Sequence, residues 1–170
     1  MEIDTSTTIA GIKIQNCINN ASGAHCQVKT QLQDLDNSIS GYITSKTCTF
    51  LKRLGNPEPR YYSFNQSSIQ SMGLPNEGYP YYLDLDTQFK KPYCISIQYQ
   101  ADDTYKSIID SIAKSSIDLL EVNLSCPNIP GKPQIGYDFE ATERIINMPL
   151  PGKKKIGLKS LKKYFIFFGK

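Results

Sequence analysis

The feature that most constrains this chain is an alternation of short apolar runs with helix-like stretches. The apolar runs are "SGYITSK" (40–46), "KPYCISIQ" (91–98), "DLLEVNLS" (118–125) and "KKKIGLK" (153–159). The helix-like stretches are "VKTQLQDLDNS" (28–38), "YPYYLDLDTQF" (79–89), "DDTYKSIIDSIAKS" (102–115) and "YDFEATERIINM" (137–148). Strands that alternate with helices predict an α/β fold with a parallel sheet, either doubly wound or closed into a barrel.

Polar residues gather where these runs end. They occupy 20–23, at the end of the run "NCINNASG", as well as 44–46 and 123–126. Ligands of βα proteins bind at the carboxyl ends of the strands. The three clusters therefore predict an active site at one edge of the sheet. The stretch 55–78, rich in Pro, Gly, Asn and Ser, is predicted to be a long loop.

The charge distribution argues against nucleic acid as a partner. The net charge is +3, but seven of the 19 basic residues are lysines within 153–170, a segment without acidic residues. The other 12 basic residues face 16 acidic ones, so the body is mildly acidic. A nucleic-acid surface needs basic residues spread over a folded face. No secretory signal and no apolar stretch of about 18 residues is seen, so we expect a cytoplasmic protein that does not enter membranes.

The cysteines predict neither a disulfide framework nor a metal site. Their number is odd, no two form a C-x-x-C pair, and His25 is the single histidine. We expect most of them to be small buried residues. The five are Cys17, Cys26, Cys48, Cys94 and Cys126.

Three kinds of residue at the strand ends admit two interpretations each. Lys46 is either a lysine that reaches solvent or a functional one, namely a Schiff-base nucleophile or a contact to an anion or cofactor. Asn123 and Asn128 either cap turns next to prolines or bind a planar, amide-rich ligand. Cys126, just before a proline, is either a buried thiol or a general base.

Longer segments resemble one family. "NLSCPNIPGKPQIGYDFEATERI", "NASGAHC", "SKTCTFLKRLGNPEPRY" and "SIQSMGLPNEGYPYYLD" are similar, in order and spacing, to segments of the cytosolic class 1A dihydroorotate dehydrogenases. The resemblance runs from about residue 9 to 159. It implies a (β/α)₈ TIM barrel that binds FMN, oxidises dihydroorotate to orotate in pyrimidine biosynthesis, and passes the electrons to fumarate. It also implies a homodimer.

The resemblance implies roles for individual residues. Cys126 matches the base that removes the C5 proton, while the C6 hydride passes to N5 of FMN. Flavin contacts fall on Ala21, Ser22, Gly23, Lys46, Thr47, Asn123 and Lys159. Substrate contacts fall on Lys46, Gln70, Met72, Gly73, Leu74, Asn123 and Asn128.

The chain departs from the family pattern at two places. Gln70 stands where the family has asparagine, and its extra methylene displaces the amide by about 1 Å, which can cost roughly 100-fold in rate. After "GLK" the sequence reads "SLKKYFIFFGK" in place of a proline-rich strand end and glycine-rich phosphate-binding turns. We therefore expect a C-terminally truncated barrel with about five of eight βα units over 1–159, a divergent tail over 160–170, and no retention of FMN by this chain alone. "YFIFF" is expected to lie at an unpaired end.

Two alternatives to an active enzyme follow. The chain could be an inactive remnant that serves as a binding or assembly partner. Alternatively, its basic tail could associate with a membrane surface.

Overall fold

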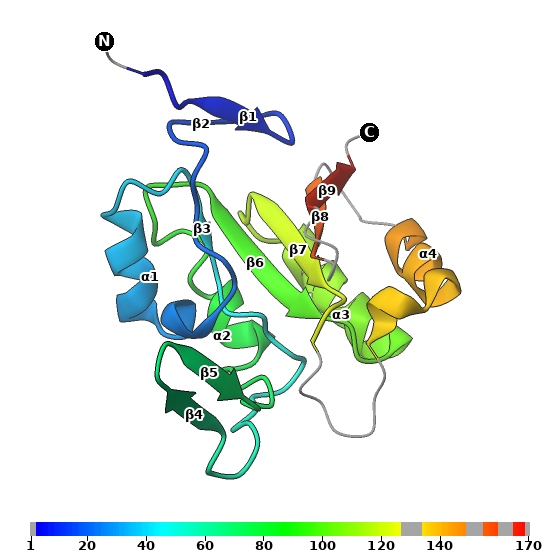
Figure 1. The fold of residues 1–170 in the computed structure, drawn as a ribbon. Helices are drawn as coiled ribbons and strands as arrows, with labels where there is room; N and C mark the ends of the chain where they lie inside the picture. The colour runs from blue at the N-terminus through cyan, green and yellow to red at the C-terminus, as the bar shows by residue number, and fades with distance from the viewer. Residues whose placement is uncertain (1–2, 127–133, 149–154, 160–164, 169–170) are drawn as a thin grey trace.

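The fold centres on a mostly parallel sheet. The computed structural model describes all residues except 1–2, 127–133, 149–154, 160–164 and 169–170, and describes 155–159 and 165–168 by their backbone. The strand order is β3-β6-β7-β8-β9, with β9 alone antiparallel (Figure 1). The bounds are β3 Ile43–Thr44, β6 Tyr93–Gln98, β7 Leu119–Asn123, β8 Lys155–Lys159 and β9 Phe165–Phe168. The four parallel strands lie on the four predicted apolar runs.

The helices confirm the predicted helical spacing. In α3, Ile108, Ile109 and Ile112 are all buried, and they belong to the same core cluster as Ile97 and Val122 of the sheet. One face of the helix therefore packs on the sheet, as its apolar stripe predicts. In α4 the Asp138 side chain caps the N-terminus by accepting a hydrogen bond from the Ala141 N–H at 2.9 Å. The bounds are α1 Lys29–Asp36, α2 Tyr79–Leu83, α3 Asp102–Ala113 and α4 Phe139–Asn147.

The other face of the sheet has an apolar layer near the start of the strands. Here Cys94 of β6 and Leu119 of β7 pack with Ile14 and Tyr42. Ile14 ends a small antiparallel hairpin, β1 (Thr7–Ile9) and β2 (Ile12–Ile14), which was not predicted. Figure 1 shows this hairpin at the end of the sheet opposite to β4 and β5.

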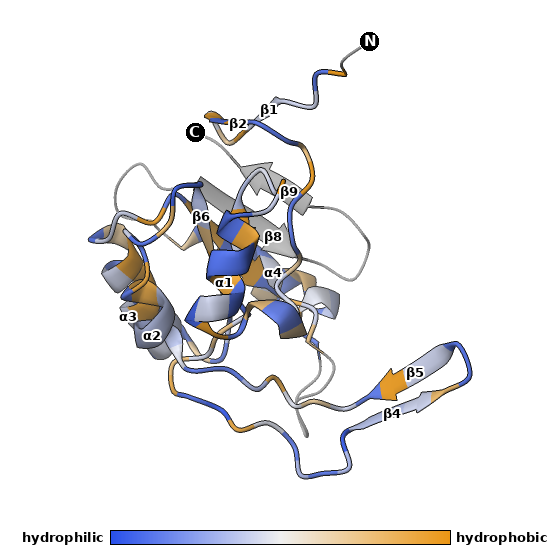
Figure 2. Ribbon diagram, turned by 90° about the vertical axis from the view of Figure 1, so that its left-hand side faces the viewer, coloured by the Kyte–Doolittle hydropathy of each residue, from blue (hydrophilic) through white to orange (hydrophobic). Residues whose placement is uncertain are grey.

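A second hairpin occupies the middle of the loop predicted over 55–78. Strands β4 (Tyr61–Phe64) and β5 (Ser67–Gln70) pair antiparallel across a two-residue turn that begins at Asn65, whose φ is +50°. Asparagine tolerates this left-handed conformation better than most residues. Figure 2 shows the hairpin as an arm that projects from the body, and its strand residues are exposed.

Two further observations bear on the sequence predictions. Phe165–Phe168 pairs antiparallel with β8 and is the last strand in the order of this sheet, so the aromatic segment of the tail is paired on one side and lies at the edge of the described sheet. The run 16–23, whose polar end was grouped with the strand ends, forms no strand. Instead, the Asn20 side chain bonds the backbone of Thr44 in β3, accepting from its N–H at 2.9 Å and donating to its carbonyl at 2.7 Å. One amide side chain thus supplies the two hydrogen bonds that a neighbouring strand would make there.

Candidate active site

A pocket of about 480 Å³ opens at the carboxyl ends of β3 and β7. The segment after β2, the segment after β3, the β4–β5 arm and the end of β7 all contribute to its wall. The lining residues are Ser22, Gly23, Ala24, Lys46, Thr47, Tyr61, Gln70, Met72, Leu74, Asn123, Ser125 and Cys126. The structure therefore brings together most of the residues predicted for the site, and places them at the predicted edge of the sheet.

Four predicted residues are not among those that line the pocket. Ala21 lies next to it, and its carbonyl accepts a hydrogen bond from the Gly23 N–H at 2.7 Å. Gly73 lies between two lining residues. Asn128 lies outside the described residues, and of Lys159 only the backbone is described, paired in register with Asn123.

Ala24 and Tyr61 line the pocket without having been predicted, while Ser125 belongs to the predicted polar cluster 123–126 but had been given no individual role. Ala24 is a sequence neighbour of a predicted residue, which was a usable signal. Tyr61 lies in the stretch that was predicted to be a loop, and no local pattern distinguishes it there.

An extra residue after β3 turns both Lys46 and Thr47 toward the pocket. The Ser45 N–H donates to the Cys94 carbonyl at 2.9 Å, and the Cys48 N–H donates to the Ser96 carbonyl at 2.8 Å. Three steps along this segment thus face two steps along β6, which is a β-bulge. Successive side chains of a regular strand point to opposite faces. The bulge removes that alternation for these two residues.

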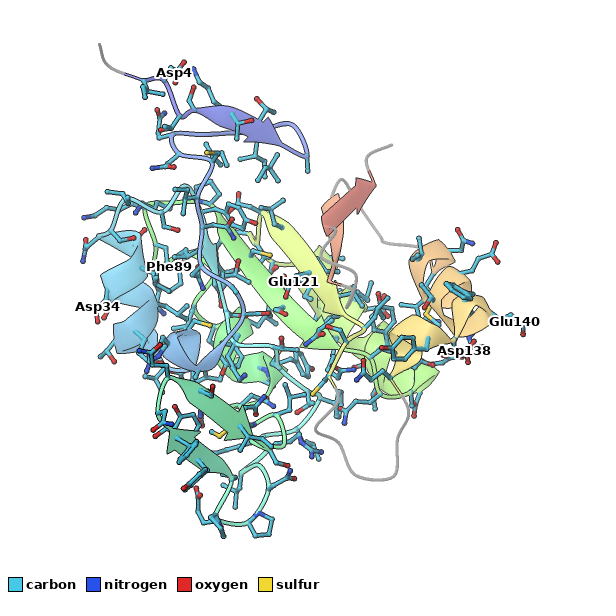
Figure 3. All side chains as sticks on the ribbon, in the orientation of Figure 1. Asp4, Asp34, Phe89, Glu121, Asp138 and Glu140 are labelled. Atoms are coloured by element: carbon cyan, nitrogen blue, oxygen red, sulfur yellow. The ribbon has the colours of Figure 1, made fainter. Side chains whose placement is uncertain are left out.

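Thr47 joins a buried polar network beneath the pocket. Its hydroxyl lies 2.9 Å from the Ser96 hydroxyl and 3.2 Å from the Ser22 hydroxyl. The Ser22 hydroxyl donates to the Glu121 carboxylate at 2.7 Å, and so does Ser96. Glu121 is 4% exposed and lies in the middle of the sheet, at the β6–β7 pair (Figure 3). It was not predicted as part of the site.

Asn123 combines the two roles that its sequence position left open. Its Oδ1 accepts hydrogen bonds from the Ser125 N–H at 3.0 Å and the Ser125 hydroxyl at 3.1 Å, so it caps the turn after β7. Its Nδ2 donates to the Thr47 hydroxyl at 3.1 Å. The second Nδ2 hydrogen has no partner among the residues that the structure describes.

Cys126 is the thiol that lines the pocket. It is half-buried and not in a disulfide. Cys48 and Cys94 are fully buried in the core, and burial raises the pKa of both thiols, which makes them poor bases. Cys26 is also buried, and its thiol donates to the Gly23 carbonyl at 3.2 Å. Of the cysteines in the described chain, Cys126 is thus placed to exchange a proton with a ligand in the pocket.

Gln70 lies at the end of β5, and its side chain makes a hydrogen bond to the turn that follows. Its Oε1 accepts a hydrogen bond from the Met72 N–H at 3.0 Å. Beyond it, Gly73 and Leu74 have φ values of +73° and +57°. The Gly73 conformation suits glycine. A Cβ on Gly73 would also lie 2.4 Å from the backbone nitrogen of Asn56, so no larger residue fits there.

Membrane-spanning and metal-binding features were sought in the described part of the chain. None of the helices described is both long and apolar enough to cross a bilayer. Within the same residues, no three His, Cys, Asp or Glu side chains are grouped as metal ligands.

Known proteins resemble the chain over most of its length. The family described as Dihydroorotate dehydrogenase matches residues 5–155. "Probable dihydroorotate dehydrogenase A (fumarate)" of Streptococcus pneumoniae strain R6 is 45% identical over 150 residues, which are 85% of this chain and 48% of the relative. The protein of Streptococcus pyogenes serotype M18, "Putative dihydroorotate dehydrogenase A (fumarate)", is 41% identical and covers 96% of this chain. This chain spans about half the length of these curated relatives.

A solved structure supports the barrel type of the fold. The crystal structure of DHODH in complex with ferulenol from Eimeria tenella aligns with a TM-score of 0.56 at 17% identity. The alignment covers 84% of this chain and 44% of that protein. At this identity the likeness concerns the fold alone, and with the family match it supports a TIM-barrel-type arrangement.

Proposed function

This chain belongs to the dihydroorotate dehydrogenase family, in the class 1A branch, and from that premise we propose that it serves the FMN-dependent oxidation of dihydroorotate to orotate, with fumarate as electron acceptor. The observation that carries the proposal is the pocket at the strand ends. Its lining includes a thiol, a lysine and a carboxamide, from Cys126, Lys46 and Asn123. The homodimer stays a prediction.

The donors of the pocket suit a planar anion edged with amides. Lys46 supplies positive charge, and the free N–H of Asn123 suits a ring carbonyl. The backbone N–H groups of Gly73 and Leu74 have no hydrogen-bond partner in the part of the chain that the structure describes. Both follow Met72 at the pocket wall, where they would hold the carboxylate of the substrate.

The residues also fit the ring of a flavin. A pocket of about 480 Å³ lies within the range of roughly 300–1,000 Å³ that holds small ligands. A Cβ built on Gly23 would meet only the Ala21 carbonyl oxygen, at 3.8 Å, so a flat ring can approach the backbone there. Ser22, Gly23, Lys46, Thr47 and Asn123 would hold the ring. When bound, the flavin supplies the acceptor for the hydride that leaves C6.

Cys126 is the residue that we assign to the proton. Its thiolate would take the proton from C5 of dihydroorotate, while the carbon–hydrogen bond at C6 breaks toward the flavin. Lys46 and the Asn123 amide would orient the ring so that C5 faces the sulfur. Negative charge that develops on the reacting groups would be stabilised by the Lys46 ammonium.

The test is formation of orotate by the purified chain, supplied with FMN, dihydroorotate and fumarate under reducing conditions. Because this chain alone is expected not to retain FMN through purification, the flavin is kept in excess throughout the assay, and orotate formation by the wild type is the result that the proposal predicts. Cys126→Ala should lower the rate by about 100-fold or more, since loss of a general base typically costs roughly 10²–10⁴-fold. Flavin fluorescence titration of the same variant should give the affinity of the wild type.

Two results would count against the proposal. Unchanged turnover in Cys126→Ala would remove this residue from the base role. Binding of FMN and orotate without any turnover in the wild type would favour the alternative, a binding or assembly partner. Thr142→Ser, a conservative change in α4 outside the pocket, is the control for handling and folding.

A further inference from the structure

A buried carboxylate lies at the root of the pocket, in a position that the proposed chemistry does not use. Glu121 Oε1 accepts from the hydroxyls of Ser22 and Ser96. An ionised carboxylate can only accept hydrogen bonds, and a serine hydroxyl carries one hydrogen. Each serine therefore donates its one hydroxyl hydrogen to Glu121, and can only accept a hydrogen bond from any other neighbour.

The same constraint fixes the direction of the hydrogen bond that Thr47 makes with these serines. Its Oγ1 lies within hydrogen-bond distance of both serine hydroxyls, at 3.2 Å from Ser22 and 2.9 Å from Ser96. Since neither serine has a hydrogen left to give, Thr47 must donate its own hydrogen to one of them. Its oxygen is then an acceptor for whatever lies on the pocket side.

On the pocket side lies the Asn123 amide. The atom 3.1 Å from Thr47 Oγ1 must be a donor, so it is the amide nitrogen. The opposite end of the amide meets the Ser125 N–H at 3.0 Å, which requires the oxygen. The amide is thus held at both ends. The loop after β7 holds its oxygen, and a chain of hydrogen bonds from Glu121 through the two serines to Thr47, here called the relay, holds its nitrogen.

We propose that Glu121 is a positioning residue: its carboxylate sets the direction of the hydrogen bonds through Ser22, Ser96 and Thr47, and so holds the Asn123 amide with one N–H facing the ligand. The part that concerns the ligand rests on the proposed function. The part that concerns the amide rests on the network alone. Glu121 touches no ligand in this scheme, and acts through Thr47.

Glu121→Gln tests the relay with little change of shape. The glutamine amide can donate to the serines, which frees their hydrogens to point at Thr47. Thr47 would then donate toward Asn123, where two donors would meet. We expect water exchange of the Asn123 side-chain amide hydrogens, measured by NMR, to become about 10-fold faster, as expected for the loss of one hydrogen bond. The resonances are assigned by their disappearance in Asn123→Asp.

Controls separate positioning from general loosening. Glu143→Gln, the same change on the exposed side of α4, should leave the exchange rate of Asn123 unchanged. In a Thr47→Val background the relay is already cut, so Glu121→Gln should add nothing further. Additive acceleration in that double variant, or an unchanged rate in folded Glu121→Gln, would overturn the proposal. Should Glu121→Gln fail to fold, Glu121→Met, of similar volume, gives the same test.

A second measurement connects the relay to the ligand. Titration with orotate in the presence of FMN should show about 10-fold weaker binding to Glu121→Gln than to wild type, again the size of one hydrogen bond. Equal orotate affinity together with faster amide exchange would overturn the ligand part of the proposal. Absence of orotate binding by the wild type would contradict the proposed function, while the exchange experiment would still decide the relay.

Discussion

Among single residues, the ion pair between Lys52 and Glu77 shows how a surface contact can depend on pH. The Lys52 ammonium lies 2.5 Å from the Glu77 carboxylate, and the Gln27 amide donates to the same carboxylate at 3.4 Å. The hydrogen bond from Lys52 is the main cause that lowers the pKa of Glu77 below its ordinary value of 4.5. Both partners keep part of their surface in water, which screens the pair.

We expect Glu77→Gln to lower the free energy of unfolding at pH 7 by less than about 1 kcal/mol. Because the pKa of Glu77 is lowered by folding, its contribution is complete above pH 4.5 and is lost as the pH falls through the folded-state value. Urea unfolding at several pH values should therefore show a difference from wild type that vanishes in acid. A difference that stays constant down to acid pH would contradict the assignment, and Glu143→Gln is the matched control.

Sequence reasoning could find the site residues that belong to a recognisable motif, but not the groups that support them. Cys126 and Asn123 stand in one short segment, and Lys46 in another. Glu121 stands two residues before Asn123, yet its hydrogen-bond partner Ser22 is 99 residues away in the chain. A local sequence pattern cannot relate residues so far apart, so the relay is seen only in the folded structure.

Among the secondary-structure elements, α3 shows how strongly burial fixes the position of a helix. Ile112 of this helix is 0% exposed within the main core cluster, whereas Ile39, in the segment between α1 and β3, is 77% exposed. The two residues have the same side chain and differ in burial. Their comparison therefore isolates the contribution of packing.

Ile112→Ala should destabilise the fold by about 2–5 kcal/mol, since it removes buried methyl groups and leaves a cavity. Ile39→Ala should change the free energy of unfolding by less than about 0.5 kcal/mol. Denaturant unfolding followed by circular dichroism measures both. Equal effects of the two substitutions would show that α3 does not pack on the sheet as described.

The elements that sequence reasoning could predict are those with a clear periodicity. The parallel strands β3, β6, β7 and β8 are apolar runs, and α3 carries an isoleucine stripe, so packing and pattern agree. The β4–β5 hairpin lies among Pro, Gly and Asn residues, and its strand residues are exposed, so no buried face marks it. The β1–β2 hairpin has strands of three residues, too short for a period to appear.

Over the molecule as a whole, the two hairpins lie at opposite ends of the sheet (Figure 1). One end is closed by β2, whose Ile14 packs against Tyr42, Cys94 and Leu119. The other end carries the pocket, with the β4–β5 arm beside it. The apolar layer thus covers one end of the sheet, and the pocket opens at the other.

Removal of residues 1–14 should open the closed end. The apolar layer would lose its cover, so Cys94, a residue that is 5% exposed and whose thiol pKa is raised by burial, should become reactive toward iodoacetamide. Mass spectrometry of the alkylated protein should show modification of Cys94 in this variant and not in wild type. Removal of residues 1–5 alone is the control, because the β1–β2 hairpin begins at Thr7. Continued protection of Cys94 would show that the hairpin does not cover it.

The bulge after β3 matters to anyone who would transplant this pocket. Lys46 and Thr47 share one face only because their segment is one residue longer than the stretch of β6 beside it. If the two side chains were placed on an evenly paired strand of a designed barrel, one of them would point toward the ligand. The other would point toward the surrounding helices. The insertion, rather than either amino acid, is the unit that has to be carried over.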